Sequence, residues 1–314
     1  MKILFKSKKR LVLSVLVSFI VLVIVVNVLA SAFFSVLIFK KDGWKGFEEY
    51  SYGEQLNNSS DWISKRGKKT LIQNTEGKEL SVLEIKNEHV SHSYMVVCHQ
   101  YGGSPLSMEE YAKHFYDLGF NIILPYMRGH GESPYKNISF GWGDRFDIVE
   151  VVEYITKNDK QAKIALFGVS LGANAVTLAA SEALPENVRL IIADSCYTSV
   201  EDLMSEHIKN QTPLSSLLVP KLISAFSKSK FGESLKSADT IAKIGNIELP
   251  VMFINGENDT VVPSLVGKKL YENCEAEGVE EVIVENGNHG RNLTADKDDY
   301  WTNVDAFILN NLGI

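Results

Sequence analysis

The sequence predicts an α/β protein, with a mostly parallel sheet covered by helices on both faces and an inserted helical cap, preceded by an N-terminal transmembrane helix. Short, fully apolar runs alternate with helix-like segments, which is typical of strands buried on both faces. A run of 29 residues, 11–39, holds no charge. Between Ala193 and Val251 there is no strand-like run.

The N-terminal run is predicted to be a membrane anchor, because about 20 apolar residues suffice to span a bilayer as a helix. Five Lys and Arg residues lie within residues 1–10. This excess of positive charge predicts a cytoplasmic N-terminus, with the body outside the cell membrane. A cleaved signal peptide is the rival, since Ala30-Ser31-Ala32 resembles a cleavage site. The apolar run continues to Phe39, which favours an uncleaved anchor.

The charge balance, the cysteines and the absence of certain sequence motifs argue against several functions. Residues 11–314 hold 27 Lys and Arg against 39 Asp and Glu, and such an acidic body argues against nucleic acid as a partner. Three scattered cysteines do not make a disulfide framework. The chain has no GxxxxGK[ST], GxGxxG or HExxH motif and no clustered His and Cys residues. We therefore expect no cofactor and no metal.

Residues 40–68 are polar and rich in Gly, Asn and Ser, and are predicted to form a stalk or linker. A folded domain is expected over 69–314. Its predicted strands are the apolar runs 80–85, 94–98, 121–124, 163–167, 189–193, 251–254 and 281–284. Its predicted helices are 108–118, 147–155, 171–184, 265–274 and 300–312.

The long interval after the fifth of these runs predicts an inserted helical cap at about 199–246. Its first part is apolar at helical spacing and is broken by Pro213 and Pro220. Long insertions in compact domains are commonly functional lids. The alternative is a helix that packs on the sheet.

The motif with most chemical content is Gly168-Val-Ser170-Leu-Gly172. It follows the predicted strand 163–167 and opens the predicted helix 171–184. A serine at such a sharp strand-to-helix turn exposes its Oγ, and glycines are needed where neighbouring side chains would clash. Ser170 is therefore the candidate nucleophile, and the alternative is an ordinary helix N-cap.

A serine needs a base at neutral pH, and His289 is the best candidate of the seven histidines. It follows the last strand-like run, in Asn286-Gly-Asn-His289-Gly290, where turn-forming neighbours predict a loop. The acid that orients this imidazole is predicted to be Asp259, after the strand 251–254. Asp194 and Glu257 are its rivals. The order Ser, Asp, His along the chain supports this choice.

These motifs resemble those of the α/β-hydrolase family, over roughly residues 94–312. The resemblance also includes His99-Gln-Tyr-Gly-Gly-Ser104 and Arg128-Gly-His-Gly-Glu-Ser133. The set is most similar to the serine hydrolases grouped near serine aminopeptidases and monoacylglycerol lipases, which include membrane-anchored members in Gram-positive bacteria.

The resemblance implies an oxyanion hole made of two backbone N–H groups, those of Leu171 and Tyr101. This chain departs from the family at one position, because His99 is followed by Gln100 where the family has glycine. A glutamine resists backbone conformations that a glycine accepts, so either the loop adapts or the hole is altered.

The resemblance further implies a serine hydrolase that cleaves an ester or related acyl bond through an acyl-enzyme. An apolar cap and a membrane anchor favour a small-molecule acyl substrate with a hydrophobic arm. A peptidase or amidase would use the same triad, so it remains an alternative. A third hypothesis, suggested by Gln100, is a degenerate hydrolase that serves as a surface binding module.

Overall fold

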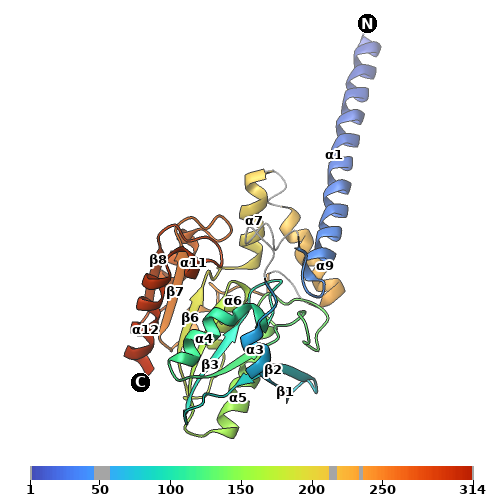
Figure 1. The fold of residues 1–314 in the computed structure, drawn as a ribbon. Helices are drawn as coiled ribbons and strands as arrows, with labels where there is room; N and C mark the ends of the chain where they lie inside the picture. The colour runs from blue at the N-terminus through green and yellow to red at the C-terminus, as the bar shows by residue number, and fades with distance from the viewer. Residues whose placement is uncertain (1, 46–56, 212–217, 233–235, 313–314) are drawn as a thin grey trace.

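The computed structural model describes residues 2–45, 57–211, 218–232 and 236–312. Its centre is an eight-stranded sheet in the order β1-β2-β4-β3-β5-β6-β7-β8 (Figure 1). Strands β4, β3, β5, β6, β7 and β8 run parallel to one another, whereas β2 is antiparallel to both of its neighbours, β1 and β4. The strands are β1 Lys68–Gln73, β2 Glu79–Ile85, β3 Ser93–Cys98, β4 Asn121–Pro125, β5 Lys163–Val169, β6 Val188–Asp194, β7 Val251–Gly256 and β8 Glu280–Val284.

Helices cover both faces of the sheet, as the fully apolar strands require. Within β5, Ile164 and Leu166 face one core, whereas Phe167 and Val169 face the other. The first core lies under α5, α6 and α10, and the second under α3, α4 and α12. Outside the 3-10 turns, the named helices are α1 Lys2–Phe39, α3 Asp61–Arg66, α4 Glu109–Asp117, α5 Asp144–Asn158, α6 Leu171–Ala180, α7 Val200–Gln211, α9 Val219–Phe231, α10 Ser264–Asn273, α11 Asn292–Ala295 and α12 Lys297–Leu312.

The predicted α/β class and mostly parallel sheet are confirmed. Each of the seven predicted strands lies within a strand of the structure, and their bounds differ by two residues at most. The helix predicted at 171–184 ends at Ala180. β1 was not predicted, because in this edge strand only Ile72 is buried and the apolar signal is weak. The interval predicted as a cap holds α7 and α9, and Ser199 pairs with Asp239 across it.

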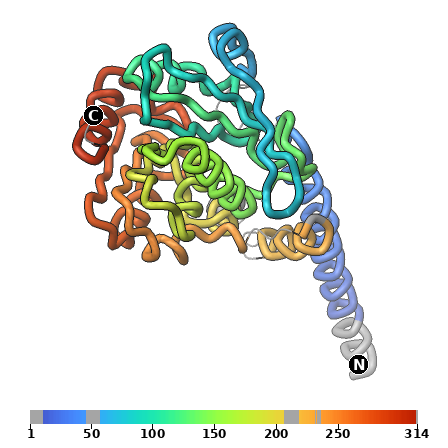
Figure 2. The backbone as a smooth tube through the Cα atoms, turned by 90° about the horizontal axis from the view of Figure 1, so that it is seen from below, coloured from blue at the N-terminus to red at the C-terminus, as the bar shows by residue number. Residues whose placement is uncertain are grey.

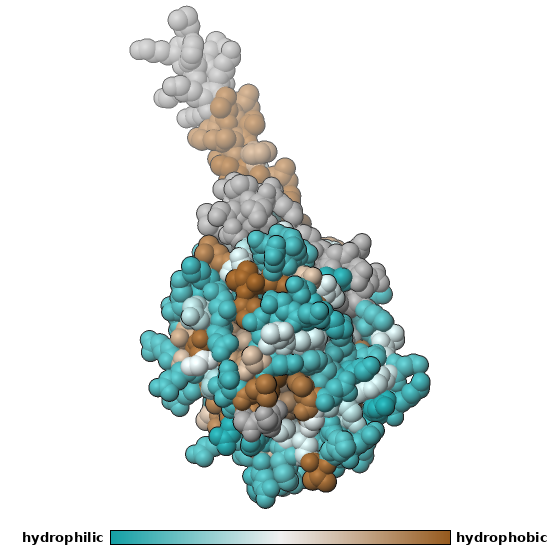
Figure 3. Space-filling view, turned by 60° about the vertical axis from the view of Figure 1, so that its left-hand side comes forward, coloured by the Kyte–Doolittle hydropathy of each residue, from teal (hydrophilic) through white to brown (hydrophobic). Residues whose placement is uncertain are grey.

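Helix α1 is long and apolar enough to cross a membrane over Leu11–Phe39. It projects away from the domain, and in Figure 3 its described part is brown, whereas the body is mostly teal. Figures 1 and 2 show α9 lying alongside the end of α1 nearer the domain, and the two helices are in contact. Toward that end, Asn27, Ser31 and Ser35 are buried or half-buried, as expected where small and polar side chains let two helices approach closely.

Residues 46–56 lie outside the described residues, so the predicted stalk over 40–68 stays a prediction. Both described ends of this interval contact the domain. The N–H of Asp42 donates to the carbonyl oxygen of Gly129. Ile63 of α3 is fully buried in the second core.

Candidate active site

Ser170 occupies the turn between β5 and α6 in a backbone conformation that side chains rarely adopt. Its φ is +53° and its ψ is −109°. Two glycines permit this turn. A Cβ at Gly168 would lie 2.3 Å from the carbonyl carbon of Gly172, and a Cβ at Gly172 would lie 2.2 Å from the carbonyl oxygen of Cys98. The GxSxG spacing is therefore a packing requirement of this junction.

The three residues predicted as nucleophile, base and acid lie next to one another. Nε2 of His289 is 2.8 Å from Oγ of Ser170. Nδ1 of the same ring is 2.8 Å from Oδ2 of Asp259. All three residues are buried. They come from three separate strand ends, because Ser170 follows β5, Asp259 follows β7 and His289 follows β8.

The carboxyl group of Asp259 is fixed from two sides. Its Oδ1 accepts the backbone N–H groups of Val261 and Val262 at 2.8 and 2.7 Å. Its Oδ2 faces Nδ1 of His289, which therefore carries a proton to donate in this pair. Nε2 of the neutral ring is then an acceptor and faces the hydroxyl of Ser170. This is the tautomer that a general base needs.

The rival acids lie elsewhere. Asp194, at the end of β6, is fully buried and accepts hydrogen bonds from Ser195, Asn292 and Tyr300 at 2.7 to 2.9 Å. Burial raises the pKa of Asp194 to about 6. Glu257 is exposed, and its carboxyl group accepts the backbone N–H of Asn286 at 3.2 Å. Neither carboxyl group has a hydrogen bond to His289 among these contacts.

The two predicted oxyanion donors lie at the ends of adjacent strands. Leu171 is the first residue of α6, where backbone N–H groups have no partner within the helix. Tyr101 follows β3, which pairs with β5 in parallel. Both residues are buried.

The loop after β3 is supported by two histidines, His99 and His130. Nδ1 of His99 donates to the carbonyl oxygen of Gln100 at 2.8 Å, and its Nε2 accepts the N–H of Met127. Nε2 of His130 accepts the N–H of Gly102 at 3.0 Å. Burial lowers the pKa of both histidines, so both rings are neutral at pH 7, as these acceptor roles require.

Gln100 replaces the family's glycine without breaking this loop. Its carbonyl oxygen accepts the N–H of Gly103 at 3.0 Å as well as the bond from His99. Its side-chain Oε1 is buried and has no hydrogen-bond partner within the described part of the chain. Gln100 does not have a positive φ, so this position does not require a glycine, and the glutamine leaves one buried acceptor unpaired among the described residues.

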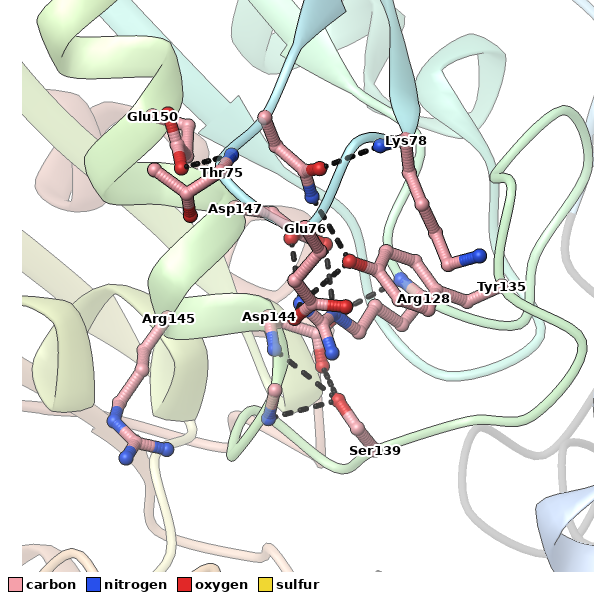
Figure 4. Close-up of polar contacts among 12 residues, drawn as sticks. Thr75, Glu76, Lys78, Arg128, Tyr135, Ser139, Asp144, Arg145, Asp147 and Glu150 are labelled. Atoms are coloured by element: carbon pink, nitrogen blue, oxygen red, sulfur yellow. Dashed lines mark hydrogen bonds and ion pairs between the residues drawn. The ribbon is translucent and has the colours of Figure 1, made fainter. Parts of the chain in front are cut away.

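A network of buried charges holds the loop after β4, as Figure 4 shows. Nε and Nη2 of Arg128 bind the two carboxyl oxygens of Asp147 at 2.8 and 2.7 Å. The guanidinium also stacks on the ring of Tyr135 at 3.7 Å. The carboxyl group of Asp144, the first residue of α5, accepts the backbone N–H groups of Arg128 and Gly141. The network therefore fixes the loop that carries His130.

In this sheet, the loops after β7 and β8 bring Asp259 and His289 to the serine turn after β5. This arrangement defines the class of protein. The chain has the α/β-hydrolase fold and is a hydrolase. The family described as alpha/beta hydrolase fold matches residues 94–217.

Particular relatives are similar over more of the chain. The uncharacterized protein YqkD of Bacillus subtilis is 27% identical over 233 residues, which cover 72% of this chain and 76% of that protein. The lysophosphatidylserine lipase ABHD12 of Xenopus tropicalis is 24% identical over 212 residues, which cover 64% of this chain and 51% of that protein. Among solved structures, the Pyrococcus furiosus esterase Pf2001 matches with a TM-score of 0.66 at 21% identity, covering 82% of this chain and 98% of that one.

Proposed function

We propose that this hydrolase is a membrane-anchored serine esterase that acts through Ser170, His289 and Asp259. The observation that carries the proposal is the pair of 2.8 Å contacts that His289 makes, one to Oγ of Ser170 and one to the carboxyl group of Asp259. A nucleophile and base within hydrogen-bond reach, with a third group orienting the base, is the arrangement that activates a serine.

In this mechanism, His289 accepts the proton of Ser170 as Oγ attacks the carbonyl carbon of the substrate. Negative charge develops on the carbonyl oxygen, which accepts hydrogen bonds from the backbone N–H groups of Leu171 and Tyr101. His289 then donates its proton to the leaving alcohol, and an acyl-enzyme remains on Ser170. Water, deprotonated by the same imidazole, attacks the acyl-enzyme and releases the acid.

The proposed substrate is an ester with a hydrophobic arm. The interval between β6 and β7 contributes apolar side chains to the core, among them Met204, Val219 and Ile223. The names of a structural neighbour, an esterase, and of a relative, a lysophosphatidylserine lipase, point in the same direction. A series of p-nitrophenyl esters tests this point: turnover that rises from acetate to longer acyl chains supports an acyl pocket, whereas a falling response contradicts it.

The anchor is proposed to leave the N-terminus in the cytoplasm and the catalytic domain outside. This rests on the five basic residues within 1–10 and on the span that follows them. External protease added to intact cells that carry an N-terminal tag should degrade the domain and spare the tag. The opposite pattern would reverse the proposed orientation.

The deciding experiment is labelling of the full chain in detergent with a fluorophosphonate probe. Labelling should be lost in Ser170→Ala and strongly reduced in His289→Ala. Ser181 lies at the C-terminal end of α6, the helix that begins directly after Ser170. Ser181→Ala therefore serves as the matched control and should label like the parent. Absence of labelling in a folded parent would contradict the esterase proposal and favour a binding module. Turnover of aminoacyl amides but not esters would replace the esterase by an amidase.

A further inference from the structure

The last turn of the membrane helix is part of the hydrolase core. Ile38 and Phe39, the final residues of α1, are only 3% and 1% exposed. The ring of Phe39 packs edge-on against Phe140 with centroids 5.2 Å apart. The carbonyl oxygen of Phe39 accepts the N–H of Ile138 at 3.0 Å. The helix therefore enters the domain beside the loop that follows β4.

Residues 38–44, which we call the anchor clamp, bind two loops at once. On the loop after β4, the N–H of Asp42 donates to the carbonyl oxygen of Gly129, and Oδ1 of Asp42 accepts the N–H of Gly131. Each of these bonds is 2.6 Å long. On the loop after β3, the clamp holds the side chain of Tyr101.

The phenol of Tyr101 is bound from both ends of the clamp. Its Oη donates to the carbonyl oxygen of Ile38 at 3.0 Å and accepts the N–H of Trp44 at 2.8 Å. Gly43 has a φ of +74°, and a Cβ there would lie 2.7 Å from Cε1 of the Tyr101 ring. The clamp therefore closes tightly around this ring.

The rest of the ring is also enclosed. Phe140 stacks on it at 5.7 Å between centroids with an interplanar angle of 22°, and His130 meets it edge-on at 6.0 Å. His130 in turn accepts the N–H of Gly102, the next residue of the loop. Moving the Tyr101 ring would therefore move the backbone of residues 101–102.

We propose that the anchor clamp positions the backbone N–H of Tyr101, so that the membrane helix is a structural component of the oxyanion hole. This inference rests on the proposed function, in which that N–H stabilises the oxyanion. Oxyanion donors act only when preorganised, and a misplacement of about 1 Å costs on the order of 100-fold in rate. The clamp residues are positioning residues, because they touch Tyr101 and not the reacting atoms.

Two variants of the full chain in detergent test the clamp, each with a matched control. Tyr101→Phe removes only the hydroxyl, and Tyr94→Phe makes the same change near the start of β3, where the hydroxyl binds Asp159. Gly43→Ala pushes a methyl group against the ring. Gly77→Ala imposes the same backbone strain at a φ of +75° with no atom within 4 Å of the new Cβ.

We expect kcat for a p-nitrophenyl ester to fall about 10- to 100-fold in Tyr101→Phe and Gly43→Ala, with little change in KM. Affinity for a boronic acid that mimics the tetrahedral intermediate should fall in parallel. Amide hydrogen exchange should become faster at residues 99–104 in these two variants. Both controls should behave like the parent in all three measurements.

The outcomes separate the two proposals. Unchanged kcat and unchanged exchange in Tyr101→Phe and Gly43→Ala would overturn the clamp. If the parent neither labels nor hydrolyses, but exchange at residues 99–104 is still faster in the two variants than in the parent, the clamp's hold on the loop is supported and the proposed function is contradicted instead. If Tyr101→Phe fails to fold, Gly43→Ala decides, since it leaves the hydroxyl in place.

Discussion

The backbone N–H of Ser170 donates a 2.8 Å hydrogen bond to the carbonyl oxygen of Asp194. The bond ties the serine turn to the end of the neighbouring strand β6. The side chain of Asp194 accepts the hydroxyl of Ser195, whose Oγ accepts the N–H of Gly290 at 3.1 Å. Gly290 directly follows His289. One residue outside the proposed triad therefore supports the positions of both Ser170 and His289.

Asp194 should give the stability of the protein a distinct pH dependence. Burial raises its pKa from 3.8 to about 6 in the folded chain, so the folded state binds this proton more tightly than the unfolded state. The resulting stabilisation is complete below about pH 4 and is lost as the pH rises through about 6. Urea unfolding of the full chain in detergent between pH 4 and 7 should show this loss.

In Asp194→Asn the same pH profile should be flatter, because the titrating group is gone while its hydrogen-bond partners remain. Asp202→Asn, an exposed change on α7, should keep the profile of the parent. A parent and an Asp194→Asn variant with the same slope from pH 4 to pH 6 would contradict the assignment.

Asp259→Asn should lower kcat about 10,000-fold, because an amide in this place favours the wrong tautomer of His289. The backbone N–H groups of Val261 and Val262 should keep the loop folded. Steady-state kinetics on a p-nitrophenyl ester would measure the loss. Asp194→Asn is the comparison, and it should cost much less. A larger loss in Asp194→Asn would exchange the roles of the two acids.

Ser170→Gly should be more stable than Ser170→Ala. Both variants lose the hydroxyl and its contact with His289, but only alanine keeps the Cβ at a φ of +53°. Residues held in sparsely populated conformations cost on the order of 1–3 kcal/mol. The difference in melting temperature isolates this strain. Equal melting temperatures would mean that the turn stores little of it.

Arg128→Lys should destabilise the protein, because an ammonium group cannot reproduce the paired contacts to Asp147. Arg128→Ala should cost more, about 3–5 kcal/mol, since it leaves a buried carboxyl group without its partner. Urea unfolding would measure both changes. Lys65→Ala breaks an exposed ion pair with Asp61 and should stay within about 0.5 kcal/mol of the parent. A loss of the same size in Lys65→Ala would contradict the argument from burial.

The sequence contained enough to predict the sheet and the positions of the candidate site residues. Buried parallel strands are continuous apolar runs, and Ser170, Asp259 and His289 each stand in a motif directly after such a run. These signals are local, because each can be recognised within about ten consecutive residues of the sequence. The edge strand β1 lacked one, because a single buried residue, Ile72, leaves no pattern.

The anchor clamp could not be predicted in the same way. Tyr101 is 63 residues from Ile38 and 57 from Trp44 along the chain. Residues 40–45 are polar and glycine-containing, so their sequence is typical of a linker whatever they contact. Gly43 has a φ of +74°, but the sequence alone does not show that this position needs a glycine.

Because the end of α1 packs into the core of the domain, it also determines where the enzyme encounters its substrate. A long flexible tether would let a catalytic domain explore a deep layer of solvent, whereas a helix that ends inside the core holds the domain at one height and one tilt. Once α1 spans a bilayer, the reaction is confined to a thin shell along one membrane face. For a substrate held in that membrane, the rate would follow its surface density rather than its bulk concentration.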